Sequence, residues 1–314
     1  MVVPGFPADY DDDCTPAIAR WVRDLASEAH VDVWTLQWPQ RTGTWRAFGA
    51  TVHGCARTGP GSGLRAVPIA VRGIIEAHRI DPYDEIRGVW AEEAGLAAVL
   101  AARAIGVPSI VSAMGVEFAG PEDIAGRRAW RRSLARRVVA AADRVEVPSN
   151  WLAERCPAPC VVRPLRVDVD LFRRPKRSSA GPRLLCVASL VPSKGVHDVL
   201  VALPLARQRV PGITLDIVGD GPMRRDLERV AGTLGGVRFL GHVRYANMPD
   251  VYATADVLVH ASHWESQGLV IDEALLSGLR VVATRVGRAA ELPDAVAVGD
   301  LSALADAIVR AVSS

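Results

Sequence analysis

Two carboxylates with a glycine between them form the most informative pattern in the sequence. Glu265 and Glu273 are eight positions apart and enclose Gly268, with apolar runs of strand length before them (255–260) and after them (279–284). This order predicts a strand-loop-helix-strand unit of a parallel sheet. Glu265 then lies where α/β sheets bind ligands, beside a helix N-terminus that attracts phosphate. Because carboxylates accept hydrogen bonds from hydroxyls, we expect a phosphate-linked sugar as the ligand.

Three other strand-to-loop junctions in the same half of the chain carry residues suited to a phosphorylated ligand. Ser189 and Lys194 follow the expected strand 184–188, and a lysine at such a turn can reach a phosphate. Gly221 follows the strand 215–218, where a glycine lets the backbone approach a ligand. Val243 follows the strand 237–240. The four junctions together predict a binding site along one edge of a sheet.

The amino-terminal half shows a second alternation of strands and helices. Strands are expected at 2–3, 31–36, 86–90, 108–113, 144–148 and 161–162. Asp13 lies in the acidic loop after the first of them, and Met114 and Gly115 lie at the carboxyl end of the fourth. A polar stretch with proline and glycine, 173–182, separates the two halves as a linker. We therefore expect one domain over 1–172 and a second over 183–314.

Bulk composition places the chain among globular proteins and excludes several partners. It has 314 residues, 49% of them hydrophobic, a net charge of +2 and a pI near 8.4, which is too mild for nucleic acid as the main partner. Aromatic residues make up 5%, which argues against a base-stacking platform. Five cysteines without a signal peptide indicate reduced thiols in a cytoplasmic protein. No apolar run approaches the length of a membrane span.

Three local patterns admit a ligand-binding interpretation, and a structural one is favoured for each. Cys156 and Cys160 lack a second pair or a nearby histidine to complete a metal site, so two buried thiols are favoured. Asp168 and Asp170 lack a third ligand, so a structural turn is favoured. The glycine-rich segment 59–63 joins elements without opening a nucleotide helix, so a mobile loop is favoured over a phosphate loop. We expect no bound metal.

A basic stretch from Arg127 to Arg137 leaves two interpretations open. Three pairs of arginines occur there on an expected helix, and Trp130, Leu134 and Val138 share one face. One interpretation is a basic face for an anionic membrane or an acidic acceptor, which would place the protein peripherally at the inner membrane face. The other, which is favoured, is a solvated face over a packed apolar stripe.

Four motifs in register over residues 183–291 carry a family resemblance. They are Leu-Val-Pro-Ser-Lys-Gly (190–195), Gly-Asp-Gly-Pro (219–222), Phe-Leu-Gly-His-Val (239–243), and the segment from Glu265 to Glu273 followed by Ala-Leu-Leu-Ser-Gly. In this order and spacing they resemble retaining nucleotide-sugar glycosyltransferases of the GT-B fold, family 4 type. The first half is similar more loosely. The resemblance implies two Rossmann-like domains facing across a cleft, the second binding a UDP-, GDP- or ADP-sugar and the first an acceptor glycan, lipid or small molecule.

The resemblance also implies roles for individual residues. Lys194 matches the position that contacts the diphosphate, and Glu265 the carboxylate near the donor sugar hydroxyls. Gly268 and Leu269 match backbone donors to the sugar and phosphate, and Glu273 matches the ribose-binding carboxylate. Val243 matches a position beside the base, and Gly221 one in the loop near the nucleotide. A departing nucleotide diphosphate develops negative charge, which a lysine and helix-end N–H groups stabilise without a metal.

The chain departs from the family pattern at four places. Ser189 stands five residues before Lys194, where the family often has arginine, so half of the expected phosphate clamp is absent or supplied by another residue. Met114 replaces the usual histidine before a glycine, and Gln267 replaces an aromatic residue. Asp13-Cys14 replaces a Gly-Gly pair after the first strand. The first strand is also short and no helix follows Val312, which a late start site or a truncated chain would explain.

Three functions are compatible with these residues. The favoured one is a retaining glycosyltransferase that moves a sugar from a nucleotide-diphosphate sugar to an acceptor hydroxyl. The second is a degenerate homologue that binds nucleotide or a partner without turnover, which the departures at Ser189, Met114 and Asp13 would support. The third, a nucleotide-sugar epimerase or NAD enzyme, is disfavoured because the chain lacks a Gly-x-Gly-x-x-Gly turn and a Tyr-x-x-x-Lys pair.

Overall fold

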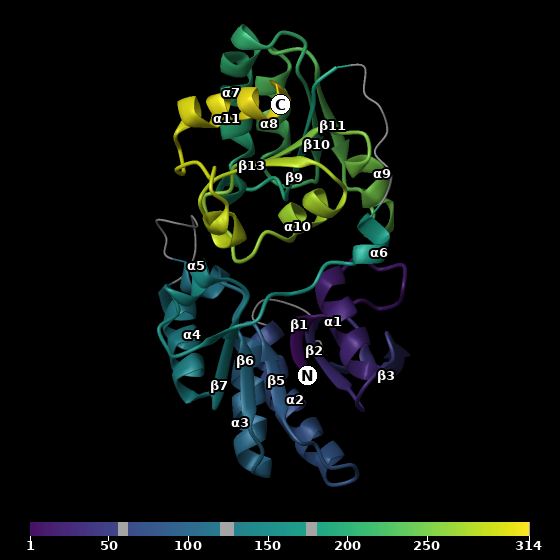
Figure 1. The fold of residues 1–314 in the computed structure, drawn as a ribbon. Helices are drawn as coiled ribbons and strands as arrows, with labels where there is room; N and C mark the ends of the chain where they lie inside the picture. Colours follow the sequence, from purple (N-terminus) through teal and green to yellow (C-terminus); the bar gives the residue numbers. More distant parts are fainter. Residues whose placement is uncertain (56–61, 120–128, 174–180, 314) are drawn as a thin grey trace. The chain divides into compact units, whose positions relative to one another are not determined.

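A computed structural model describes residues 1–55, 62–119, 129–173 and 181–313. These residues form two compact units that divide between Arg166 and Val167. Each unit is an α/β domain built on a largely parallel sheet, as the alternation of strands and helices predicts. Figure 1 shows the elements of both units along the chain.

The first unit contains an eight-stranded sheet in the order β3-β4-β2-β1-β5-β6-β7-β8. Neighbouring strands are parallel except β3 and β4, which form an antiparallel hairpin at one edge. The six strands expected from the sequence are confirmed as β1, β2 and β5 to β8, with bounds that differ by a few residues, whereas β3 and β4 were not predicted. The bounds are β1 Val2–Gly5, β2 Asp32–Trp38, β3 Thr42–Ala47, β4 Ala50–Cys55, β5 Ile86–Val89, β6 Ser109–Ser112, β7 Arg144–Val147 and β8 Val161–Val162.

Helices cover both faces of this sheet. α2 and α3 bury small and branched side chains against one face, and α1 packs Ile18, Ala19 and Val22 on the other. α3 is rich in alanine on its buried side, which brings it close to the strands; Gly88 of β5 and Gly95 of α3 lie so near each other that a Cβ on Gly88 would come within 2.7 Å of the Gly95 Cα. The bounds are α1 Pro16–Ala26, α2 Ser62–His78, α3 Glu93–Ile105, α4 Ala129–Ala141 and α5 Asn150–Ala153, with a 3-10 turn at Val116–Phe118.

The second unit has a five-stranded parallel sheet in the order β11-β10-β9-β12-β13. Its strands are β9 Arg183–Val187, β10 Thr214–Val218, β11 Val237–Gly241, β12 Val257–His260 and β13 Arg280–Ala283. Its helices are α6 Val169–Phe172, α7 Val196–Arg209, α8 Arg224–Ala231, α9 Met248–Tyr252, α10 Leu269–Leu276 and α11 Leu301–Ser313, with 3-10 turns at Pro192–Lys194, Tyr245–Asn247 and Gly287–Glu291.

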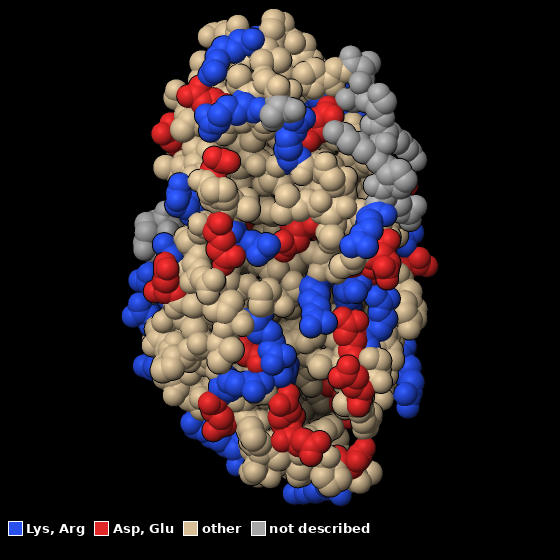
Figure 2. All heavy atoms as spheres, viewed as in Figure 1, with Lys and Arg blue, Asp and Glu red and all other residues tan. Residues whose placement is uncertain are grey.

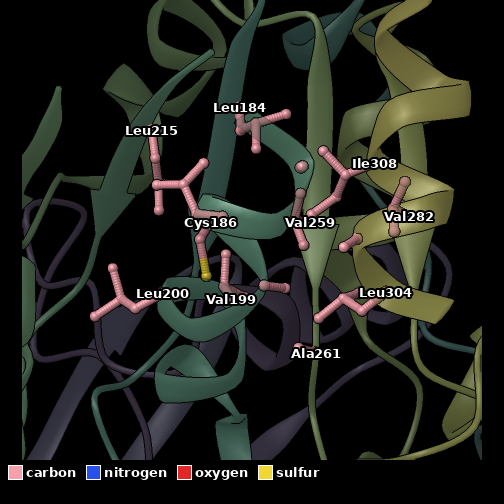
Figure 3. Packing of buried hydrophobic residues seen from close by; sticks show 14 of the residues in the cluster. Leu184, Cys186, Val199, Leu200, Leu215, Val259, Ala261, Val282, Leu304 and Ile308 are labelled. Carbon is pink, nitrogen blue, oxygen red and sulfur yellow. The ribbon is translucent and has the colours of Figure 1, made fainter. Parts of the chain in front are cut away.

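Alternate residues of the strands β9, β12 and β13 enter different cores. Leu184 and Cys186 of β9 face α7 and α11, whereas Leu185 between them faces α9 and α10. Figure 3 shows the first of these cores, where Leu200 of α7 and Ile308 of α11 point towards the strands. Both faces of the central strands are therefore covered, which leaves their carboxyl ends as the place for a ligand.

The helix α6 packs with the second unit, although the sequence places residues 167–172 in the first domain. Phe172 is fully buried there, edge-on to the rings of Tyr245 and Tyr252, and its carbonyl accepts a hydrogen bond from Ser277. Asp168 accepts a hydrogen bond from the backbone N–H of Leu171 at 3.1 Å and caps this helix. The expected structural turn at Asp168 is thus a helix cap.

The basic helix is only partly neutralised. Arg127 and Arg128 lie outside the described residues, as does most of the glycine-rich segment 59–63. Arg131 pairs with Glu92 at 2.5 Å and with Glu93 at 3.1 Å, whereas Arg136 and Arg137 are exposed. Figure 2 shows basic and acidic side chains interspersed on the face in view. Membrane contact through this helix stays a prediction.

Among the helices described, none combines the length and the apolar character needed to span a bilayer.

A buried ion pair joins β5 and β7, the two strands that flank β6 in the first sheet. Arg87 of β5 and Glu146 of β7 have side chains 9% and 3% exposed, and their closest N and O atoms are 2.5 Å apart. Glu146 also pairs with Arg144 at 2.8 Å and Arg163 at 3.2 Å, and Arg87 lies over the ring of Trp21. Removing one partner of such a pair costs more than the pair contributes, since the other charge stays buried.

We therefore expect Arg87→Met to lower the free energy of unfolding by about 3 kcal/mol, because Arg144 and Arg163 neutralise Glu146 only in part. Urea denaturation followed by circular dichroism measures the change. Arg72→Met is the matched control, since Arg72 is exposed on α2 and pairs, within the described residues, only with the exposed Glu76, and its midpoint should equal that of the wild type. Equal midpoints for both variants would show that the buried pair does not stabilise the sheet.

Candidate functional site

The second unit brings the predicted site residues to the carboxyl ends of its strands. Ser189 and Lys194 follow β9, Gly221 follows β10, Val243 follows β11, and Glu265 follows β12. The strands β9 and β12 are neighbours in the sheet, while the chain proceeds from β9 to the opposite side through β10 and β11. The loops after β9 and β12 therefore flank the topological switch point, where open α/β sheets bind ligands.

Lys194 and Glu265 meet at this switch point. The Lys194 Nζ atom lies 2.5 Å from the Glu265 Oε2 atom, and the two side chains are 25% and 12% exposed. Burial alone would raise the pKa of Glu265, but the charge of Lys194 and the neighbouring His260 outweigh it and lower the pKa from 4.5 to about 2. Glu265 is therefore an anion at neutral pH, held against a cation that can also bind phosphate.

The loop between Glu265 and α10 contains one residue, Gly268, whose backbone conformation favours glycine. Gly268 precedes Leu269, the first residue of α10, with φ of 82°, and a Cβ there would lie 3.2 Å from Glu265 Cγ. Glu265 Oε1 accepts a hydrogen bond from the backbone N–H of Ser266 at 3.1 Å. The carboxylate and the start of the helix are thus held close together.

Two glycines at this edge are required by contacts between loops. A Cβ on Gly195, after Lys194, would lie 1.9 Å from the carbonyl oxygen of Ala261, and one on Gly221 would lie 2.6 Å from that of Leu190. The sequence suggested that Gly221 allows a ligand to approach. In the structure its missing side chain allows the loop after β10 to approach the loop after β9. The loops that follow β9, β10 and β12 therefore pack directly on one another.

Glu273 lies in a different environment from Glu265. It is 6% exposed on α10, and its Oε2 atom accepts a hydrogen bond from the hydroxyl of Tyr252 at 2.8 Å. Burial raises the pKa of Glu273 from 4.5 to about 7, with Tyr252 opposing the shift. Val243 is half-buried against the apolar core to which α9 and α10 contribute, and Ser189 is exposed. Their roles in nucleotide binding stay predictions.

The predicted residues of the first domain lie at strand ends of their own sheet. Asp13 follows β1, and Met114 and Gly115 follow β6. The backbone N–H groups of Met114 and Ala91 both donate to one oxygen of Glu117, at 2.9 Å each, which ties the loops after β5 and β6 together. Met114 also borders a cavity of about 570 Å³ beside α1, together with Trp21 and Glu146. Whether Met114 contacts an acceptor stays a prediction.

Metal ligands do not gather in the part of the chain that the structure describes. Within these residues no group of three or more His, Cys, Asp or Glu side chains is placed to hold an ion. Cys156 and Cys160 are half-buried, and burial raises the pKa of Cys156 to about 11, which disfavours the thiolate that binds metals. The expectation of a metal-free reaction stays a prediction.

Comparison with known families assigns both halves of the chain. The sequence model described as "Glycosyl transferases group 1" matches residues 181–314, and that described as "Glycosyl transferase 4-like domain" matches residues 14–169. Two parallel α/β domains of these types define the GT-B fold class. The chain belongs to the group 1 glycosyltransferases, with a 4-like first domain.

Individual relatives cover parts of the chain, and solved structures cover all of it. A glycogen synthase of Mycobacterium tuberculosis is 37% identical over 130 residues, 39% of this chain and 31% of the relative. A GDP-mannose-dependent phosphatidylinositol monomannoside mannosyltransferase of the same species is 33% identical over 186 residues, 51% of this chain and 48% of the relative. The matches thus span less than half of these relatives.

Two solved structures share the fold at low sequence identity. Sucrose-phosphate synthase of Thermosynechococcus elongatus has a TM-score of 0.81 at 20% identity, covering 100% of this chain and 90% of the other. HepE of Anabaena, solved in complex with UDP, has a TM-score of 0.72 at 19% identity with the same coverage. These likenesses confirm the predicted fold class.

Two side chains that shape this site, His260 and Tyr252, were not predicted from the sequence. His260, the last residue of β12, places its Nε2 atom 3.4 Å from Glu265 Oε2, and Tyr252 holds Glu273. His260 carried a usable signal, since it is a polar residue at the end of an apolar strand and five positions before Glu265. Tyr252 carried none, because a tyrosine near the end of a short helix is as easily a core residue.

The raised pKa of Glu273 predicts a stability effect that depends on pH. Its folded pKa of about 7 lies above the ordinary 4.5, so its contribution to folding is complete below pH 4.5 and is lost as the pH rises through 7. Glu273→Gln removes this titration and keeps an oxygen for the hydroxyl of Tyr252. We expect the variant to be more stable than the wild type by up to about 3 kcal/mol at pH 8 and by less than about 1 kcal/mol at pH 5.

Urea unfolding of the ligand-free protein at the two pH values measures this difference. Glu76→Gln, on an exposed carboxylate of α2, controls for the loss of one negative charge. A difference between E273Q and the wild type that is the same at pH 5 and pH 8 would contradict the assigned environment of Glu273.

Proposed function

We propose that the protein is a retaining glycosyltransferase that moves a sugar from a nucleotide-diphosphate sugar to an acceptor hydroxyl. The observation that carries the proposal is the contact of Lys194 with Glu265 at the switch point of the second domain. It combines a cation for a diphosphate with an ionised acceptor for sugar hydroxyls, next to a helix N-terminus. The retaining course rests on the resemblance of the motifs to family 4 enzymes.

In this proposal the cleavage of the donor develops negative charge on the nucleotide diphosphate. Lys194 and the first N–H groups of α10, beginning at Leu269, stabilise that charge. Glu265 accepts hydrogen bonds from the donor sugar, and Glu273 binds the ribose. Val243 lies beside the base, and the loop of Gly221 borders the nucleotide. The leaving group needs no metal, because lysine and backbone dipoles supply the positive potential.

The second phosphate contact is the weakest part of the predicted site. Ser189 is exposed and offers a hydroxyl where the family often has an arginine. A hydroxyl can donate one hydrogen bond to a phosphate oxygen, but it adds no charge. We therefore expect this enzyme to depend on Lys194 more strongly than an enzyme with both cations would.

The relatives support a nucleotide-sugar donor and leave the acceptor open. Their names describe a glycogen synthase and a GDP-mannose-dependent mannosyltransferase of a phosphatidylinositol glycolipid, and HepE was solved with UDP. Donors with guanine or uracil bases are therefore candidates, and the motif resemblance adds adenine. A glycan, a lipid or a small molecule remains open as the acceptor, which we assign to the first domain. A lipid acceptor would give the exposed Arg136 and Arg137 a role at an anionic membrane surface.

Lys194→Met should weaken the binding of nucleotide-diphosphate sugars at least 10-fold, because it removes the side-chain cation assigned to the diphosphate. Calorimetry with a panel of UDP-, GDP- and ADP-sugars first selects the donor and then compares the variants. Arg229→Met is the control, since it removes a cation of the same domain whose side chain is 75% exposed on α8. Equal affinity of K194M and the wild type would contradict the assigned site.

Glu265→Gln should lower turnover about 100-fold and leave the affinity for the bare nucleoside diphosphate within 3-fold, because Glu265 is assigned to the sugar. Release of nucleoside diphosphate with the selected donor measures turnover. Asp306→Asn, on an exposed residue of α11, is the control. If E265Q loses bare nucleotide instead, Glu265 belongs to the nucleotide end of the site. If the wild type binds nucleotide but releases none from any donor and acceptor, the protein is a binding homologue without turnover.

A further inference from the structure

We propose that His260 is a positioning residue. It donates a hydrogen bond to Glu265 when Lys194 moves from that carboxylate to the diphosphate of the donor. The inference rests on the proposed function and adds a residue to its site. It starts from the partners of Glu265. The oxygen Oε1 receives the N–H of Ser266 at 3.1 Å, while Oε2 receives the ammonium of Lys194 at 2.5 Å and faces His260 Nε2 at 3.4 Å.

Lys194 cannot keep its close contact with Glu265 and also bind a diphosphate at full strength. Its ammonium has three N–H donors, but a phosphate that draws it away lengthens the 2.5 Å contact with Oε2. Glu265 is 12% exposed at its side chain, so water replaces the lost donor only in part. A buried carboxylate oxygen that loses its partner carries a desolvation cost. The site therefore needs a second donor that reaches the same oxygen.

His260 is placed to be that donor. The residue is 4% exposed, and its Nε2 atom is buried without a hydrogen-bond partner in the part of the chain described. At 3.4 Å from Oε2 the ring nitrogen is about 0.5 Å beyond an ordinary N–H···O hydrogen bond. A small movement of the ring would form a hydrogen bond from His260 Nε2 to Glu265 Oε2, which gives both atoms a partner once Lys194 has moved. The cost of leaving His260 unpaired in the free protein is thus recovered when the donor binds.

The backbone around His260 is fixed, and the space beside its ring is kept clear. His260 ends β12 opposite Ala283 of β13, and its carbonyl accepts the N–H of Thr284 at 3.0 Å. A Cβ on Gly268 would lie 3.5 Å from His260 Nε2 and 3.2 Å from Glu265 Cγ. Glycine at 268 therefore leaves both side chains room to approach each other, in addition to providing the φ that the loop requires.

The exchange assigns different consequences to the two neighbours of Glu265. Loss of Lys194 removes charge from the diphosphate and weakens nucleotide binding. Loss of His260 leaves the diphosphate contact intact and disorients Glu265 only after the donor has taken Lys194. The effect of His260 should therefore appear in turnover and not in the affinity for bare nucleotide.

Turnover and binding of three variants test this inference. His260→Leu removes the donor at similar volume and should lower kcat 10- to 100-fold, with the Kd for nucleoside diphosphate within 2-fold of the wild type. His260→Gln places an amide N–H near the position of Nε2 and should restore kcat to within about 5-fold of the wild type. His197→Gln, on an exposed histidine of α7, should match the wild type. Unchanged kcat in H260L, no recovery in H260Q, or loss of bare nucleotide binding in both would overturn the inference.

A second measurement does not depend on turnover. Nitrogen-15 NMR of the histidine rings, with H260Q to assign the signal, should show a proton on His260 Nε2. In K194M, where Glu265 has lost its ammonium, that proton should move downfield as the hydrogen bond shortens. An unprotonated Nε2, or a signal that K194M does not move, would overturn the inference. If no donor is turned over by the wild type, the proposed function fails, and this measurement still decides whether His260 serves Glu265.

Discussion

The arrangement of the loops at the carboxyl ends of the strands in the second domain depends on the contact between Lys194 and Glu265. The two residues come from loops after adjacent strands, 71 positions apart, and their charges are largely withdrawn from water. Such a pair forms only if both loops are fixed, since its attraction must offset the cost of desolvation. The glycines fix them: Gly195 lies against Ala261, and Gly268 and Gly287 lie against Glu265. The loop backbone is therefore built around the pair.

Much of this arrangement could be predicted from sequence because it follows from the order of strands. Apolar runs of strand length followed by Lys194 or by Glu265 place both residues at the same edge of a parallel sheet. That they form an ion pair could not be predicted, since a strand end does not specify the direction of a side chain. The same limit applies to His260, whose position at a strand end could be predicted but whose ring could as well have been a satisfied core group. The order of strands in the sequence predicts where the site lies, whereas side-chain packing determines which of its residues are in contact.

The first domain was harder to predict because its informative residues look like surface residues. Arg87 and Glu146 lie in segments that alternate like half-exposed strands, yet their side chains are 9% and 3% exposed and pair with each other. The hairpin of β3 and β4 has mostly exposed residues on β3, so it lacks the apolar alternation that reveals a strand. Charge partners distant in sequence and an edge hairpin with little core contact leave no local signal, and both belong to the domain where the family resemblance was looser.

Glu265 and Glu273 show why spacing alone could not separate their chemistry. Both carboxylates are largely buried, eight positions apart, and burial raises the pKa of each. Lys194 and His260 reverse the shift at Glu265, whereas the neutral hydroxyl of Tyr252 opposes it only in part at Glu273. One carboxylate is thus a fixed anion at neutral pH, and the other is near its titration point. A ribose or sugar hydroxyl donates more strongly to an anion than to a protonated acid. The fixed anion is therefore the group suited to orient a reacting sugar, and a ligand at Glu273 must first favour its ionised form.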